Sequence, residues 1–191
     1  AEIEETVKAI FKEIQTKGDT AVAKYTSLFD GIKLENFLVS KDEIIEAEKQ
    51  VSTELKEAIA LAKSNIYKFH SAQKTNKIEV ETTKGVLCWQ EKRPIQKVGL
   101  YIPSGTAPLF STVLMLAIPA QIAGCDEIIL CSPPDKNGKI NPTILYAANL
   151  CGMTKIFKVG GIQAIAAMTF GTATIPKVYK IFGKVFSFLS S

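Results

Sequence analysis

The chain has 191 residues, of which 47% are hydrophobic and 22% are charged, and its formal net charge at pH 7 is +4. This length and composition indicate a globular protein with one core, or one domain and part of a second, and they exclude a disordered chain. Lysine and glutamate residues are interleaved through the first half, so no basic stripe for nucleic acid is present, and no apolar run reaches the roughly 18 residues that span a membrane.

Histidine and cysteine residues are few and scattered, which argues against a metal centre or a catalytic triad. His70 is the only histidine, and it lies near the end of an expected helix, where a structural or capping role suits the helix dipole. Because the chain has no Cys-x-x-Cys pair, we expect buried, reduced thiols at Cys88, Cys125, Cys131 and Cys151. The acidic start, residues 1–5, is unlike a secretion signal, so a cytoplasmic location is expected.

Apolar residues at spacings of three and four predict helices in the first part of the chain. The first helix carries an apolar stripe over residues 3–14 and ends at Gly18. Asp19 or Thr20 is expected to cap the second helix, which ends at Asp30. The residues of this second helix that should face inward are Val22, Tyr25 and Phe29.

Two further helices and a hairpin follow. A third helix is predicted to begin after Ser40, because Glu43 follows at the spacing of a capping box, and a fourth covers residues 53–73. Over residues 77–90 the apolar period changes to two, which predicts a β-hairpin that turns near Gly85.

Strands and helices alternate regularly after Pro94. The expected strands are residues 97–102, 127–131, 155–159 and 178–182, and the expected helices are residues 110–123, 142–150 and 162–170. This alternation predicts an α/β fold with a parallel, right-handed wound sheet. The boundary between the helical part and the α/β part is expected near residues 93–96, and the two parts should pack together because this link is short.

Ligands of such sheets bind beyond the carboxyl ends of the strands, where helix amino termini gather. Gly160 and Gly161 would allow a ligand close to the backbone, and Gln163, in the first turn of the next helix, would bond a ligand amide or ribose hydroxyl. Tyr101, at a strand end, would stack on a ring. Alternatively, the glycines are turn residues and Tyr101 is a core aromatic. A G-x-G-x-x-G fingerprint is absent, so a standard dinucleotide clamp is not expected.

Several long stretches of the chain resemble the histidinol dehydrogenase family. They are residues 98–103 (VGLYIP), 106–115 (TAPLFSTVLM), 119–125 (PAQIAGC), 144–148 (ILYAA) and 160–172 (GGIQAIAAMTFGT). Residues 18–19, 25–26, 29–31 and 93–94 are also similar to the family's amino-terminal half. Because these stretches occur in the right order, the resemblance is specific, and it covers nearly the whole chain up to Gly183.

The resemblance implies a zinc- and NAD-dependent oxidoreductase of histidine biosynthesis, which oxidises L-histidinol through L-histidinaldehyde to L-histidine. It also implies a homodimer with Rossmann-like domains and with active sites at the subunit interface. In the family pattern, the Tyr of the LYIP stretch and the Gln of the GGxQ stretch contact NAD, and here they are Tyr101 and Gln163.

The resemblance also suggests how the chain is divided. Residues 1–94 are expected to form a helical region with a β-hairpin, which belongs to the family's first Rossmann-like domain. Residues 95–191 are expected to form a Rossmann-like cofactor-side domain that is incomplete at its carboxyl end.

The end of the chain departs from the family. The family's third NAD contact, an Asn, follows the stretch that ends here at Gly183, whereas this chain continues with residues 184–191 (KVFSFLSS). The family's zinc ligands and its acid/base pair lie later still, so no catalytic residue and no metal ligand is assigned here.

Three interpretations follow. The first is a carboxy-terminally truncated histidinol dehydrogenase that does not oxidise histidinol by itself. The alternative is a non-catalytic fragment that acts at most as a weak nucleotide-binding or assembly module. A short aldehyde-dehydrogenase-like reductase is disfavoured, because no cysteine lies beside groups that would stabilise its thiolate.

Overall fold

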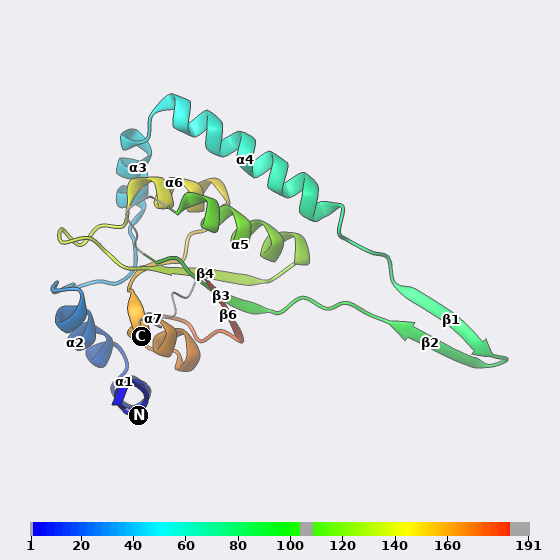
Figure 1. Ribbon diagram of the computed structural model, residues 1–191, viewed down its shortest axis with the longest axis horizontal. Coiled ribbons are helices and arrows are strands. Elements are labelled where there is room, and N and C mark those ends of the chain that lie inside the picture. Colours follow the sequence, from blue (N-terminus) through cyan, green and yellow to red (C-terminus); the bar gives the residue numbers. More distant parts are fainter. Residues whose placement is uncertain (1, 104–108, 184–191) are drawn as a thin grey trace.

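The computed structural model describes residues 2–103 and 109–183. At its centre lies a four-stranded parallel sheet in the order β5-β4-β3-β6, with helices on both faces (Figure 1). The strands are β3 (Lys97–Tyr101), β4 (Glu127–Ser132), β5 (Ile156–Lys158) and β6 (Lys180–Gly183). The predicted Rossmann-like α/β fold is confirmed.

The two faces of the sheet enter two separate cores, because successive side chains of a strand point to opposite sides. Leu130 and Ile156 belong to one cluster, whereas Ile129 and Phe157 belong to the other. The first cluster is covered by α3 (Lys41–Gln50), α4 (Thr53–Ser71), α5 (Phe110–Ala123) and α6 (Pro142–Leu150). The second is covered by α1 (Glu2–Lys17), α2 (Asp19–Phe29) and α7 (Gly161–Phe170).

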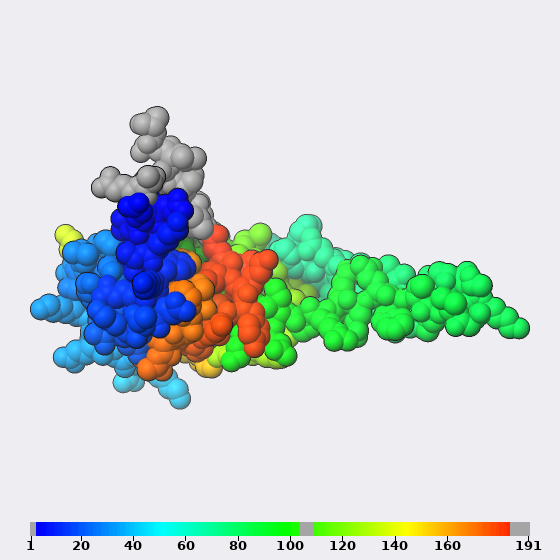
Figure 2. Space-filling model, turned by 90° about the horizontal axis from the view of Figure 1, so that it is seen from below, coloured from blue at the N-terminus to red at the C-terminus, as the bar shows by residue number. Residues whose placement is uncertain are grey.

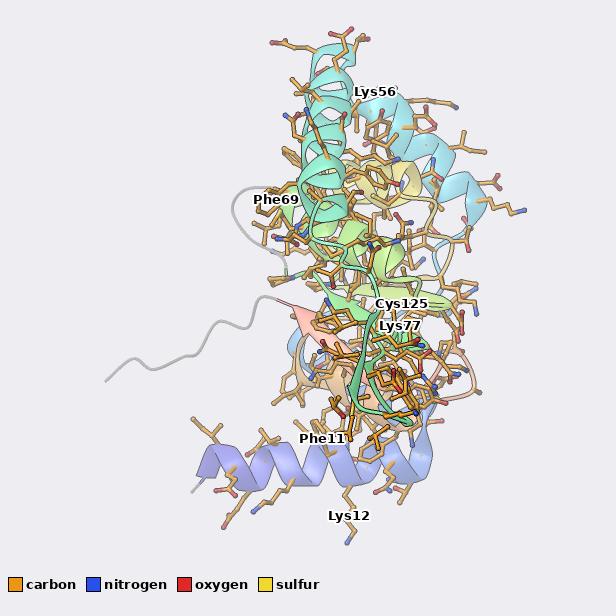
Figure 3. The ribbon with its side chains drawn as sticks, turned by 90° about the vertical axis from the view of Figure 1, so that its right-hand side faces the viewer. Phe11, Lys12, Lys56, Phe69, Lys77 and Cys125 are labelled. Carbon is orange, nitrogen blue, oxygen red and sulfur yellow. The ribbon has the colours of Figure 1, made fainter. Side chains whose placement is uncertain are left out.

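Helix α1 is amphipathic, as its spacing predicts. Ile14 is fully buried, and Phe11 meets Phe170 of α7 edge to face with 5.8 Å between the ring centroids. Figure 3 shows Phe11 on the side of α1 that faces the rest of the molecule and Lys12 pointing away from it. Ile3 is 77% exposed, so only the later part of the predicted apolar stripe is buried.

The start of helix α2 differs from the prediction, whereas its predicted end at Asp30 is confirmed. Its N-cap is Gly18, with φ 53°, and no side chain caps the helix there. Asp19 instead accepts a hydrogen bond of 2.7 Å from the hydroxyl of Thr174, a residue far away in the sequence that local spacing cannot reveal. Phe29 is 53% exposed and stacks on Tyr25, so the expectation that Phe29 faces inward is wrong.

The start of α3 confirms the predicted capping box. The hydroxyl of Ser40 accepts from the backbone N–H of Glu43 at 3.1 Å, and the Glu43 carboxylate accepts from the backbone N–H of Ser40 at 2.9 Å. Two orphan donors of the first helical turn are satisfied in this way, which explains why the helix begins where the sequence predicts.

The predicted hairpin forms from β1 (Ile78–Thr83) and β2 (Val86–Gln90), with Gly85 in the turn. Residues 72–96, called the arm below, are all exposed and project from the body (Figures 1 and 2). Cys88 lies on the arm and is exposed, so the expectation of buried thiols is wrong for this residue. Cys131 and Cys151 are buried, and Cys125 is half-buried. The alternation of apolar residues over 77–90 predicts strands, but it does not show whether a core covers them.

The division of the chain at residues 94 and 95 stays a prediction. Helices from before this point cover both faces of the sheet, so the two parts share their cores. None of the described helices combines the length and the apolar character needed to cross a membrane.

Candidate functional site

The candidate site lies at the carboxyl ends of β3 and β5, where α7 begins. Tyr101 is the last residue of β3, and Gly161 and Gln163 lie in the first turn of α7. Asp30 reaches the same place from the end of α2. The edge of the sheet therefore brings together residues from three distant parts of the chain, as expected for a ligand site in a parallel α/β sheet.

Tyr101 is held by the backbone of the glycine pair. Its hydroxyl oxygen accepts a hydrogen bond of 2.9 Å from the N–H of Gly161. Burial raises the pKa of Tyr101, and the negative charge of Asp30 acts in the same direction, against the effect of the Gly161 bond. The phenol therefore keeps its proton at neutral pH, and its O–H group remains a donor.

Gln163 is fully buried and only partly paired. Its Nε2 donates to Oδ2 of Asp30 at 3.0 Å. Its Oε1 is buried and has no hydrogen-bond partner among the described residues. A buried acceptor without a donor is unusual in proteins, so this oxygen is a candidate partner for a ligand donor.

Asp30 is the residue that the sequence analysis missed. Local spacing predicts Asp30 as the end of the second helix, and its backbone N–H does donate to the carbonyl of Thr26 as the C-cap of α2. Burial raises the pKa of Asp30, whereas the bond from Gln163 lowers it. A carboxylate beside a glycine at a helix end is an ordinary stop signal, so only its inclusion in the similar stretch 29–31 pointed to more.

Both glycines are required by the geometry of the strand-to-helix crossing. A side chain at Gly160 would collide with Pro133, which packs against it. Gly161 has φ +59°, a conformation that favours glycine, and a Cβ there would lie 2.9 Å from Oε1 of Gln163. The space beside the unpaired oxygen is thus the space that a side chain at Gly161 would occupy.

A cavity of about 480 Å³ opens at the end of the neighbouring strand β4. The residues that line it include Pro103, the stretch 132–135 and Glu43. The Lys158 ammonium lies 3.0 Å from a carboxylate oxygen of Glu43. Burial acts to raise the pKa of Glu43, but the Ser40 N–H and Lys158 outweigh it and hold this pKa below its usual value. Because Pro133 touches Gly160 and also lines the cavity, the cavity adjoins the site.

The single histidine lies away from this edge, near the carboxyl end of α4. Its Nδ1 is 2.8 Å from Oε1 of Gln73, and its ring meets Phe69 edge to face. The structural role expected for His70 stays a prediction. Within residues 2–103 and 109–183, no three His, Cys, Asp or Glu side chains are grouped as metal ligands would be.

The profile of the family described as histidinol dehydrogenase matches residues 1–189. The chain belongs to this family. A histidinol dehydrogenase of Bacteroides fragilis is 61% identical over 179 residues, which are 94% of this chain and 42% of that protein. A histidinol dehydrogenase of Escherichia coli O6:H1 is 54% identical over 181 residues, 95% of this chain and 41% of that protein.

A solved structure of the family has the same fold. The crystal structure of histidinol dehydrogenase from Elizabethkingia anophelis superimposes with a TM-score of 0.95 at 56% identity, and the match covers 97% of this chain and 43% of that chain. The chain therefore spans less than half the length of the histidinol dehydrogenases it matches.

Proposed function

We propose that this chain forms the cofactor-binding part of a histidinol dehydrogenase, an NAD-dependent oxidoreductase that converts L-histidinol through L-histidinaldehyde to L-histidine. Membership of the family supports the reaction. The observation that supports cofactor binding is the buried, unpaired Oε1 of Gln163 beside Tyr101 and Gly161. An unpaired buried acceptor costs about 1–3 kcal/mol, which a ligand donor would recover.

The residues at the sheet edge fit NAD, whose nicotinamide ring, when bound, would accept hydride. The Tyr101 hydroxyl would donate to the cofactor and Gln163 Oε1 would accept from it. The backbone N–H groups at the start of α7 carry partial positive charge, which suits the cofactor diphosphate. The cavity of about 480 Å³ beside Pro133 has the size of a typical small-molecule pocket and would take part of the nucleotide.

Zinc does not fit the described residues, because they bring no set of three metal ligands together. We propose that the zinc ligands and the acid/base pair belong to the part of the family that this chain does not match. On this proposal the 191-residue chain binds NAD but does not oxidise histidinol.

The test is a titration of the purified chain with NAD by calorimetry, followed by an assay of NADH formation with L-histidinol, NAD and zinc. A full-length histidinol dehydrogenase serves as the positive control. Binding without turnover is the expected result. Steady NADH formation would contradict the proposed inactivity, and a folded chain that binds no NAD would contradict the proposed cofactor site.

A second proposal is assembly into a homodimer, and the arm is the observation that favours it. Its two strands carry large apolar side chains that are about half exposed, and a two-stranded hairpin is only marginally stable in water when nothing covers it. These side chains are Ile78, Val80, Val86, Leu87 and Trp89. We expect the molar mass in sedimentation experiments to rise with concentration above the 20.8 kDa of one chain. A constant mass of one chain would contradict assembly. The cytoplasmic location stays a prediction.

A further inference from the structure

The contact between Asp30 and Gln163 determines which end of the glutamine amide faces the site. An ionised carboxylate accepts hydrogen bonds and cannot donate them, so the NH₂ group of Gln163 must be the end that faces Asp30. The bond of 3.0 Å from Nε2 to Oδ2 of Asp30 has this polarity. The carbonyl oxygen Oε1 is thereby turned away from Asp30.

The free oxygen then lies next to Gly161. A Cβ at Gly161 would be 2.9 Å from Oε1, and Gly161 itself is exposed. This oxygen has no partner among the described residues and is itself buried, so a donor would have to enter beside Gly161 to reach it.

Tyr101 offers a ligand a hydrogen-bond donor, whereas Gln163 offers an acceptor. Its oxygen already accepts the N–H of Gly161, and its burial keeps the phenol protonated. The hydroxyl can therefore offer its O–H to a ligand as a donor. The site thus presents a donor from β3 and an acceptor from α7, both positioned beside the same glycine.

We propose that Asp30 is a positioning residue, which holds Gln163 as an acceptor so that the site selects a ligand group with an acceptor and a donor side by side. A ribose diol or a carboxamide has this pattern. The inference rests on the proposed function, because it concerns the same cofactor site. Asp30 acts through Gln163 and need not touch the cofactor.

Three variants test whether Asp30 determines which end of the Gln163 amide faces the ligand. In Asp30→Asn the new amide can donate to Gln163 and let its NH₂ group turn toward the ligand, so we expect about tenfold weaker NAD binding. In Gln163→Glu two carboxylates face each other, and we expect a larger loss. The double variant combines Asp30→Asn with Gln163→Glu. Its Asn amide donates to one carboxylate oxygen at position 163, and the second carboxylate oxygen stays available as the acceptor for the ligand. The net charge of the pair equals that of the native pair, so binding should recover to within about threefold of the native value.

Asp126→Asn is the matched control, because Asp126 is exposed and precedes β4 at the opposite edge of the sheet. It should bind NAD like the native chain. Thermal unfolding of every variant shows that the chains compared are folded. If Asp30 only held α2 in place, the double variant would not recover NAD binding. Native affinity in Asp30→Asn, or a double variant as weak as Gln163→Glu, overturns the proposal.

A measurement without ligand separates this proposal from the proposed function. The side-chain NH₂ signals of Gln163 in an ¹⁵N-labelled chain should move in Asp30→Asn and stay unchanged in Asp126→Asn. If the native chain binds no NAD, the proposed function fails and these signals alone decide the positioning role. Unchanged Gln163 signals in Asp30→Asn would refute that role.

Discussion

Replacing Gly161 by alanine should weaken cofactor binding and also destabilise the chain, and the two effects can be measured separately. At φ +59° an alanine is in the left-handed region, which costs about 1–2 kcal/mol of unfolding free energy. The new Cβ would also lie 2.9 Å from Oε1 of Gln163 and occupy the approach to that oxygen. Loss of the ligand bond to this acceptor should weaken NAD binding about tenfold or more.

Gly152 provides the control for the backbone. Its φ is +71° and no atom lies within 4 Å of the position that a Cβ would take, so Gly152→Ala carries the same conformational cost with open space around it. Denaturant unfolding should show a similar loss of stability for both variants, whereas calorimetric titration with NAD should show weaker binding only for Gly161→Ala. Equal affinity of the two variants for NAD would refute the reasoning.

Three further predictions concern the rest of the molecule. Hydrogen bonds from Lys24, then from Tyr25 and Lys17, lower the pKa of Glu13 to about 2. The ionised carboxylate therefore stabilises the fold above pH 4.5, the usual value, and this contribution is lost as the pH falls toward 2. The difference in unfolding temperature between the native chain and Glu13→Gln should shrink over that range, and a difference that does not change with pH would contradict the shift. Leu130→Ala, at a fully buried position in β4, should lower the unfolding free energy by about 2–5 kcal/mol, and a loss below about 1 kcal/mol in denaturant unfolding would show that this core is loosely packed. In thiol labelling, exposed Cys88 should react fast, whereas buried Cys131, whose pKa is raised by burial, should react only on unfolding. The fast phase should disappear in Cys88→Ser, and its persistence would point to another accessible thiol.

Features that depend on neighbours in the sequence were predicted well. The capping box of Ser40 and Glu43, the hairpin turn at Gly85 and the strand-to-helix crossing at Gly160 all follow from residues within a few positions of one another. Helix and strand periodicity acts over the same short range, which is why the alternation after Pro94 predicted the parallel sheet. The sequence also sufficed to recognise the family, whereas the cofactor contacts assigned to Tyr101 and Gln163 stay predictions.

Tertiary structure alone decided what these residues touch. Asp30 lies 133 positions before Gln163, and Asp19 lies 155 positions before its partner Thr174, so no local spacing predicts either contact. The same holds for the arm, because alternating residues indicate a strand whether or not a core covers it. Local sequence determines which elements form, since their hydrogen bonds and caps are short-range. Which side chains meet depends on how the helices pack on the sheet. That packing brings Asp30, at the end of α2, to Gln163 of α7 at the candidate site.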